Sequence, residues 1–152
     1  MGSGAGRPRA RCVVRTAEPN EHDRIHEILS IAFGPDRSNE VIDGFQRRSM
    51  EETQLVFLAT VGRKTVGCVI AELCDTVIIY NLAVLPDHRE MGVADTLVQR
   101  AMELMCRDHR PTFFFTAVHP DRPRGAARFS RLGFKEVGVE DGYLLMMRRA
   151  VS

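Results

Sequence analysis

A short charged stretch between two apolar segments has the composition of an anion-binding turn. Residues 87–97 read DHREMGVADTL and follow an apolar run that ends at Leu85. Where a strand turns directly into a helix, the first N–H groups of the helix have no intrahelical acceptor and carry the positive end of the helix dipole. Gly92 and Ala94 let such a backbone approach a ligand closely, and Arg89 adds a positive charge. The same residues fit either a main-chain phosphate site or an ordinary strand-to-helix turn.

The same stretch lacks the two common nucleotide-binding patterns. It matches neither G-x-x-x-x-G-K-[ST], which marks nucleoside-triphosphate P-loops, nor G-x-G-x-x-G, which marks dinucleotide sites. If the turn binds phosphate, the sequence therefore disfavours a P-loop nucleotide or a dinucleotide as the ligand.

The composition argues against several classes of partner. A net charge of +1 is unlike that of nucleic-acid or membrane-surface binders, because both depend on clustered basic residues. No apolar run approaches the roughly 20 residues of a transmembrane helix. The four cysteines form no CxxC pair, and His22 and His26 lack a third ligand nearby. We therefore expect no metal, no nucleic acid, no membrane contact, and reduced thiols in a cytoplasmic protein.

Hydrophobic periodicity predicts a sheet whose strands are interrupted by helices. Strands are expected over 11–18, 53–61, 65–73, 76–85 and 112–118, with a closing hairpin of FKEVGVE and GYLLMMRR around Asp141 and Gly142. Helices are expected over 19–34 with Asn20 as N-cap and Gly34 as stop, over 38–50, from Ala94 to just before Pro111, and over 121–133 with Gly133 as C-cap. The strand over 112–118 is expected at the centre of the sheet, with both faces covered.

The length fits one domain with a sizeable core. We expect residues 11–152 to form this domain and residues 1–10 to form a flexible arm. The predicted order of elements, β-α-α-β-β-β-α-β-α-β-β, is typical of a mixed α/β fold.

The stretch LAVLPDHREMGVA resembles the signature of the GNAT superfamily of acetyl-CoA-dependent acyltransferases. That signature is [RQ]-x-x-G-x-[GA] directly after a strand ending in xVxP, and Arg89 to Ala94 match it after Val84 and Pro86. The segment GAARFSRLGF, residues 125–134, resembles the superfamily's C-terminal motif. With the order of the elements, the resemblance covers nearly all of residues 11–149. It implies a single-domain α+β fold.

In this implied fold, a mixed and mostly antiparallel sheet of six or seven strands carries about four helices. The fourth and fifth strands splay apart, and the thioester of acetyl-CoA enters between them. The resemblance also implies that acetyl-CoA is the acyl donor.

The resemblance assigns roles to individual positions. Backbone N–H groups from Arg89 to Ala94 would hold the coenzyme A pyrophosphate, and Leu82 to Val84 would pair with pantetheine as a neighbouring strand does. A main-chain N–H near Leu82 would polarise the thioester carbonyl. Arg131 is either a partner of the nucleotide phosphates or a solvated arginine. The implied coenzyme-binding residues are Leu82, Ala83, Val84, Arg89, Glu90, Met91, Gly92, Val93, Ala94, Phe129 and Arg131.

The proton-transfer positions depart from the family pattern. Many members have a tyrosine four residues before the glycine of LGF that protonates the departing thiolate, and this sequence has Phe129 there. Family bases often lie at the positions of Ile78, which is inert, and Tyr80. A tyrosine hydroxyl ordinarily titrates at about 10 and would need strong tuning to act as a base. His119 directly follows the fifth strand, where a histidine is suited to shuttle protons.

Each candidate also fits a structural role, Tyr80 as a strand aromatic with a satisfied hydroxyl and His119 as a loop histidine. Glu72, on the strand over 65–73, could act through water or be a solvated carboxylate. We take Tyr80, His119 and the main chain of Leu82 as the candidate catalytic groups.

The sequence predicts an N-acyltransferase that moves an acetyl group directly from coenzyme A to a small-molecule or peptide amine in a ternary complex. A catalytically weak or silent GNAT-like domain that binds acyl-CoA as a regulator or scaffold is the alternative, motivated by Phe129 and Ile78. A plain interaction domain leaves the spacing of the phosphate turn unexplained. The closing hairpin could expose an edge for a homodimer, but nothing in its pattern demands one. The acceptor cannot be read from the sequence.

Overall fold

The computed structural model describes residues 11–34, 54–120 and 123–150 of the chain. Within these residues, seven strands alternate with three α-helices and two short 3-10 helices, η2 (Pro19–Glu21) and η3 (Pro86–His88). The strands are β1 (Cys12–Thr16), β2 (Gln54–Val61), β3 (Lys64–Leu73), β4 (Val77–Val84), β5 (Phe113–Val118), β6 (Lys135–Glu140) and β7 (Tyr143–Arg149). The α-helices are α1 (His22–Phe33), α3 (Val93–His109) and α4 (Pro123–Arg131).

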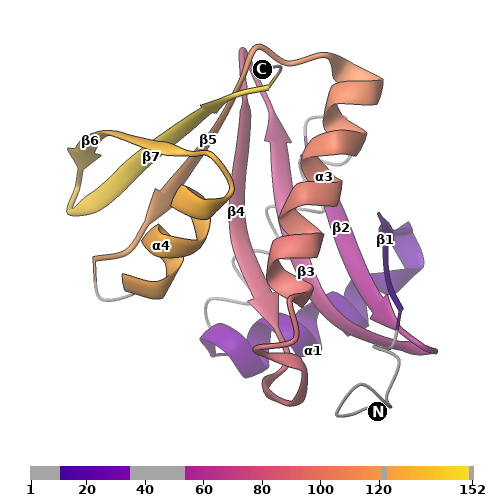
Figure 1. Ribbon diagram of the computed structural model, residues 1–152. Helices are drawn as coiled ribbons and strands as arrows, with labels where there is room; N and C mark the ends of the chain where they lie inside the picture. The colour runs from indigo at the N-terminus through magenta and orange to yellow at the C-terminus, as the bar shows by residue number, and fades with distance from the viewer. Residues whose placement is uncertain (1–10, 35–53, 121–122, 151–152) are drawn as a thin grey trace, which may run out of the picture.

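The strands form one sheet in the order β1-β2-β3-β4-β5-β7-β6. β4 and β5 are parallel, and every other neighbouring pair is antiparallel. α3 packs across β1 to β4 on one face, and α1 packs against β3 and β4 on the other (Figure 1). The predicted mixed and mostly antiparallel sheet is confirmed.

Each long helix buries one amphipathic face against the sheet. In α3, Leu97, Val98 and Ala101 are fully buried at helical spacing and join an apolar cluster that includes Phe57 and Ile79. In α1, the buried residues are Ile25, Ile28 and Leu29, which pack with Val56, Leu58, Cys68 and Ile70 in a second cluster. Full burial of one such aliphatic side chain contributes about 1.5–3 kcal/mol, so these two faces hold the sheet between the helices.

β4 separates from β5 after only two paired residues. The parallel ladder joins Val77 to Phe114 and Ile78 to Phe115, and β4 then continues for six residues without pairing to β5. On its other side, β4 has one extra residue relative to β3, because Cys68 pairs with Ala83 whereas Ile70 pairs with Tyr80. Figure 1 shows the two strands adjacent at one end and diverging toward the N-terminus of α3. The predicted splay of the fourth and fifth strands is confirmed.

The extra residue of β4 is a β-bulge centred on Asn81 and Leu82. Asn81 has a φ of 52°, a left-handed conformation that asparagine tolerates better than most residues. A bulge bends its strand and changes the direction of neighbouring backbone groups. The bulge lies three residues beyond Ile78, the last residue of β4 that pairs with β5, and at the position where the resemblance implies a thioester-binding N–H.

Most predicted turns and helix ends are confirmed. Gly34 ends α1 with its N–H bonded to the Ser30 carbonyl, and the turn at Asp141 and Gly142 joins β6 to β7. The N-cap prediction for Asn20 is wrong, because Asn20 lies inside η2. Instead, Glu18 and Glu21 form a reciprocal capping box around this turn, and α1 begins after Glu21.

Three further predictions differ from the structure or fall outside it. α4 (Pro123–Arg131) ends two residues before the predicted end at 133, because its last turn closes on Gly133, and the predicted start at 121 lies outside the described residues. The predicted helix over 38–50 lies outside the described residues. β5 is interior as predicted, but only one of its faces is fully buried by the described residues: Phe114, Thr116 and Val118 are buried whereas Ala117 is exposed. The reason is that α1 packs on β3 and β4 rather than on β5.

Candidate active site

The turn before α3 presents main-chain donors at the end of β4. Glu90 and Gly92 both have a left-handed φ, 67° and 78°, and Gly92 is the N-cap of α3. The first bond of the helix runs from the Thr96 N–H to the Gly92 carbonyl at 3.0 Å. The four preceding amides therefore have no acceptor within the helix; they belong to Gly92, Val93, Ala94 and Asp95.

Gly92 is required by its backbone conformation and leaves open space beside it. A Cβ built there would meet no atom within 4 Å, so crowding by the protein does not explain the glycine. A left-handed φ favours glycine, and the missing side chain keeps the approach to the amides clear. The turn thus has the form predicted for an anion cradle.

Arg89 is held by the protein itself. Its N–H bonds to the Pro86 carbonyl at 3.3 Å, and its side-chain Nε donates to the Val84 carbonyl at 3.1 Å. The Arg89 amide therefore completes η3 instead of adding a donor to the turn. Its guanidinium ties the turn to the last residue of β4 and leaves its charge near that strand end.

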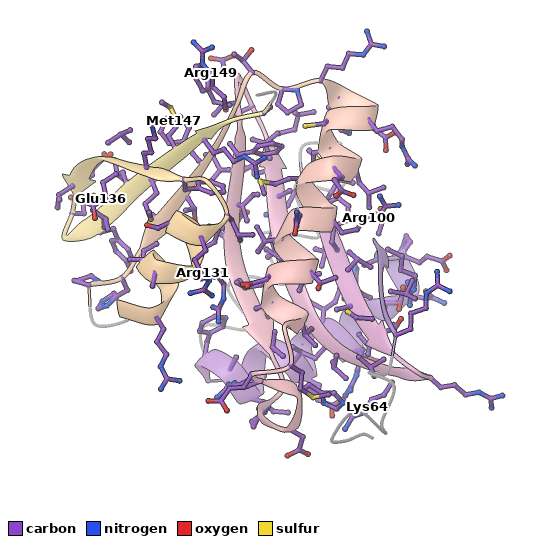
Figure 2. All side chains as sticks on the ribbon, in the orientation of Figure 1. Lys64, Arg100, Arg131, Glu136, Met147 and Arg149 are labelled. Carbon is purple, nitrogen blue, oxygen red and sulfur yellow. The ribbon has the colours of Figure 1, made fainter. Side chains whose placement is uncertain are left out.

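Asp95 in the first turn of α3 is neutralised by two arginines of α4. Its Oδ1 lies 3.2 Å from Arg128 Nε, and its Oδ2 lies 3.5 Å from Arg131 Nη2. Figure 2 shows Arg131 on the side of α4 that faces α3. These ion pairs hold α4 beside the amide donors, so Arg131 lies next to the turn where the sequence places it.

Phe129 closes the end of α4 and lies in the core. The Phe134 N–H bonds to the Phe129 carbonyl at 2.9 Å, and the Gly133 N–H bonds to the Ser130 carbonyl at 3.1 Å, which is a Schellman cap. The two phenylalanine rings meet edge to face with centroids 5.1 Å apart, and Phe129 is only 6% exposed. The LGF motif is thus a helix stop, and Phe129 serves packing.

Leu82, Ala83 and Val84 place their side chains in or against the core. Ala83 and Val84 are buried on opposite faces of the sheet, and Leu82 is half-buried. Any contact of this segment with pantetheine would therefore be made by its main chain, beyond the point where the pairing with β5 ends.

Tyr80 belongs to a polar cluster that spans three strands. Its hydroxyl donates to Glu72 Oε2 at 3.4 Å and accepts a hydrogen bond from Gln54 Nε2. Glu72 lies directly opposite Gln54 in the β2–β3 ladder. Tyr80 and Glu72 are half-buried, whereas Gln54 is 3% exposed. Sequence reasoning missed Gln54, although a polar residue at the start of an apolar strand was a usable signal.

His119 follows β5 and contacts the other half of the sheet. Its ring meets the ring of Tyr143 edge to face with centroids 5.3 Å apart. Tyr143 begins β7, so this contact lies on the β5 side of the divergence and the Tyr80 cluster on the β4 side. The predicted proton-transfer groups therefore lie on opposite sides of the point where β4 and β5 separate, Tyr80 on the β4 side and His119 on the β5 side.

The described residues contain no group of three side chains able to hold a metal ion. Within the same residues, no helix is long and apolar enough to cross a membrane.

Comparison with known families gives one match that spans more than half of the chain. Residues 52–136 match the family described as "Acetyltransferase (GNAT) domain". An N-alpha-acetyltransferase of Saccharolobus solfataricus is 31% identical over 65 residues, which are 43% of this chain and 39% of that protein. The chain thus matches about two-fifths of the length of that curated relative.

Solved structures share the fold at low sequence identity. The ribosomal-protein-S18-alanine N-acetyltransferase of Escherichia coli has a TM-score of 0.76 at 17% identity, with 93% of this chain and 96% of that chain covered. The spermidine N-acetyltransferase of Vibrio cholerae, solved with CoA and spermine, has a TM-score of 0.75 at 15% identity, with 91% and 95% covered. These likenesses confirm the predicted GNAT-like α+β fold.

Proposed function

Because the chain belongs to the GNAT acetyltransferase family, we propose that it transfers an acetyl group from acetyl-CoA directly to a primary amine. The observation that carries this proposal is the turn of Glu90 to Asp95. It presents four helix-terminal amides at the end of β4, beside the point where β5 diverges. An activated acyl donor with a pyrophosphate needs both features in one place, one for the phosphates and one for the thioester.

The coenzyme is held mainly by backbone. The amides of Gly92, Val93, Ala94 and Asp95 bind the pyrophosphate, together with those of Glu90 and Met91. The main chain of Leu82 to Val84 pairs with pantetheine in place of β5. Arg131 exchanges part of its contact with Asp95 for a nucleotide phosphate, since it is 61% exposed and already lies beside the turn.

The reaction needs one hydrogen-bond donor that stabilises the oxyanion and one group that accepts the amine proton. The amine nitrogen attacks the thioester carbonyl, the C–S bond breaks, and the N–H near Leu82 stabilises the oxyanion of the tetrahedral intermediate. Tyr80 and His119, on the two sides of the strand divergence, are the groups that accept the amine proton. The departing thiolate takes up the last proton from the amine nitrogen. A thiol ordinarily titrates at about 8.5 and leaves without an acid, so Phe129 is compatible with turnover.

A peptide α-amine is the acceptor that the comparisons favour first. The relative with the highest sequence identity named above is an N-alpha-acetyltransferase. A polyamine is the second acceptor to test, because the Vibrio cholerae structure holds spermine.

The phosphate turn is tested with two matched glycine variants. Gly92 and Gly142 have nearly the same φ, 78° and 83°, and open space around a built Cβ. Gly92→Glu and Gly142→Glu therefore carry a similar conformational cost, but only Gly92→Glu places a carboxylate at the proposed pyrophosphate site. Calorimetric and thermal-shift titrations with CoA should show binding to the wild type and to Gly142→Glu.

At 100 times the dissociation constant, CoA should add about 2.7 kcal/mol to the stability of these two proteins. Gly92→Glu should lose at least about tenfold in affinity, because a like charge faces the phosphates. Equal affinity in the two variants would contradict the assignment of the turn.

A further inference from the structure

The hydrogen bonds among Gln54, Tyr80 and Glu72 form a chain that ends on a carboxylate. Gln54 Nε2 donates to the Tyr80 hydroxyl, and the hydroxyl donates to Glu72 Oε2. The proton of Tyr80 therefore points to a carboxylate, and the phenol oxygen receives an N–H on another side. A neutral tyrosine held in this way can accept a proton as it gives up its own.

Burial distinguishes the two ends of the cluster. Gln54 is 3% exposed, and its buried Oε1 has no hydrogen-bond partner among the residues that the structure describes. A buried amide oxygen without a hydrogen bond is unfavourable, so the fold retains Gln54 against a penalty. Glu72 is only half-buried, so a proton that reaches its carboxylate can leave to solvent.

We infer that Gln54, Tyr80 and Glu72 form a proton relay for the acetyl transfer, with Glu72 as the terminal acceptor and Gln54 as a positioning residue. The inference rests on the proposed function. The acceptor ammonium gives a proton to Tyr80 Oη while the Tyr80 proton passes to Glu72 Oε2. The neutral amine then attacks the thioester, the C–S bond breaks, and the thiolate takes the second proton released by the nitrogen. The products are the amide, the thiol and protonated Glu72, which returns its proton to water.

The relay removes the difficulty that the sequence raised for Tyr80. A free tyrosinate would form at neutral pH only if the pKa of the hydroxyl fell far below its ordinary value of about 10. In the relay the phenol never carries a full negative charge, because its proton leaves as another arrives. The Glu72 carboxylate supplies the basicity.

A double-mutant cycle in kcat tests whether the three residues act as one unit. The probes are acetyl-CoA with a hexapeptide bearing a free N-terminus, and acetyl-CoA with spermidine. Tyr80→Phe and Glu72→Gln should each lower kcat about 100-fold, and Gln54→Met about tenfold, with the KM for acetyl-CoA nearly unchanged. In the Tyr80→Phe background, Glu72→Gln and Gln54→Met should cost nothing further. Glu136→Gln, on exposed β6, is the control for loss of a carboxylate and should leave kcat unchanged.

A second readout needs no acceptor. The chain has two tyrosines, so labelling tyrosine with ¹³C at Cζ gives two resonances, which Tyr143→Phe assigns. Glu72→Gln and Gln54→Met should shift the Tyr80 resonance and leave that of Tyr143 in place. This measurement also shows whether Gln54→Met keeps the native fold.

The outcomes separate the relay from the function on which it rests. Additive losses in kcat, or an unmoved Tyr80 resonance, overturn the relay while acetyl transfer stands. If neither amine is acetylated by wild-type protein that binds CoA, the proposed function and the relay fail together. Non-additive losses with a shifted Tyr80 resonance support both.

Discussion

Asp95 shows how a single residue that conflicts with a predicted site is accommodated. A carboxylate in the first turn of a helix is favourable for the helix dipole but repels a bound phosphate. Two arginines from α4 reach this carboxylate at 3.2 and 3.5 Å, which offsets its charge. Sequence spacing could not bring Arg128 and Arg131 to Asp95, because more than 30 residues and a strand of the sheet lie between them.

Removing that carboxylate should strengthen coenzyme binding. In Asp95→Asn, the repulsion of the phosphates is lost and Arg131 is released toward them. We expect the affinity for CoA to rise about two- to fivefold, as measured by calorimetry, with a small loss of thermal stability. Weaker binding would mean that Asp95 holds Arg131 in its productive position.

The position of the turn before α3 could be predicted from the sequence because its residue pattern is local. Gly92 lies at the N-cap of α3 with a φ of 78°. Gln54 could not be assigned in the same way, because its partners Tyr80 and Glu72 depend on the register of three strands. The hydrogen bond of the Arg89 amide to the Pro86 carbonyl, within a short 3-10 turn, could not be predicted from the sequence either.

At the scale of elements, α4 is positioned by two sets of contacts at its C-terminal end. Its C-terminal end closes in a Schellman cap at Gly133, whose φ is 93°, and Arg148 Nη1 donates to the Leu132 carbonyl at 2.9 Å. Its arginines contact the first turn of α3. The placement of Arg131 beside the phosphate turn therefore depends on the cap as well as on the ion pairs.

Gly133→Ala should destabilise the protein and loosen this placement. The left-handed φ costs an alanine about 1 kcal/mol, and its Cβ would press on the Arg148 side chain at 3.4 Å. Gly138→Ala is the matched control on β6, where φ is not left-handed and a Cβ meets nothing within 4 Å. Urea unfolding should show a loss of about 1–2 kcal/mol for Gly133→Ala alone. Equal losses would contradict the role of the cap.

The junction between β1 and α1 contains an ion pair with a defined pH dependence. Arg15 contacts both carboxylate oxygens of Glu21 at 2.6 and 2.7 Å, and this hydrogen bonding lowers the pKa of Glu21 below its ordinary value of 4.5. A lowered folded-state pKa stabilises the protein above the ordinary value, and the stabilisation is lost as pH falls through the folded pKa.

Glu21→Gln should therefore lower the unfolding free energy at pH 7 by about 0.5–1 kcal/mol, the size of an exposed ion pair. The difference from wild type should shrink as the pH is lowered below 4.5. Glu103→Gln, which removes an exposed pair within α3, is the control and should have little effect. A difference that persists unchanged at pH 2 would exclude the ion pair as its cause.

At the scale of the whole molecule, the strand order could be anticipated only in part. Periodicity locates each described strand and helix to within about three residues, because one face of each element is buried. The insertion of β7 between β5 and β6 depends on which edges pair, and local patterns do not contain that information. The incomplete burial of β5 likewise could not be predicted from the sequence, since apolar residues such as Phe113 and Phe115 need not be fully buried.

The core should protect one cysteine until the whole molecule unfolds. Cys68 is fully buried between β3 and α1, and burial raises its pKa to about 12. Because the thiolate is the reactive form, Cys68 should resist iodoacetamide at pH 8 in the native protein, whereas exposed Cys74 should react. Mass spectrometry across a urea series should show Cys68 labelling only through the unfolding transition. Earlier labelling would reveal local opening of the sheet.

The most direct test of the account is amine-dependent acetyl transfer by the wild-type protein and by the matched variants Gly92→Glu and Gly142→Glu. Free thiol released from acetyl-CoA is followed with the hexapeptide and with spermidine, and the acetylated product is identified by mass spectrometry. The account predicts product and matching thiol release with wild type and Gly142→Glu, and loss of both at low acetyl-CoA in Gly92→Glu. Undiminished transfer by Gly92→Glu, or no acetylated amine with wild type, would contradict it.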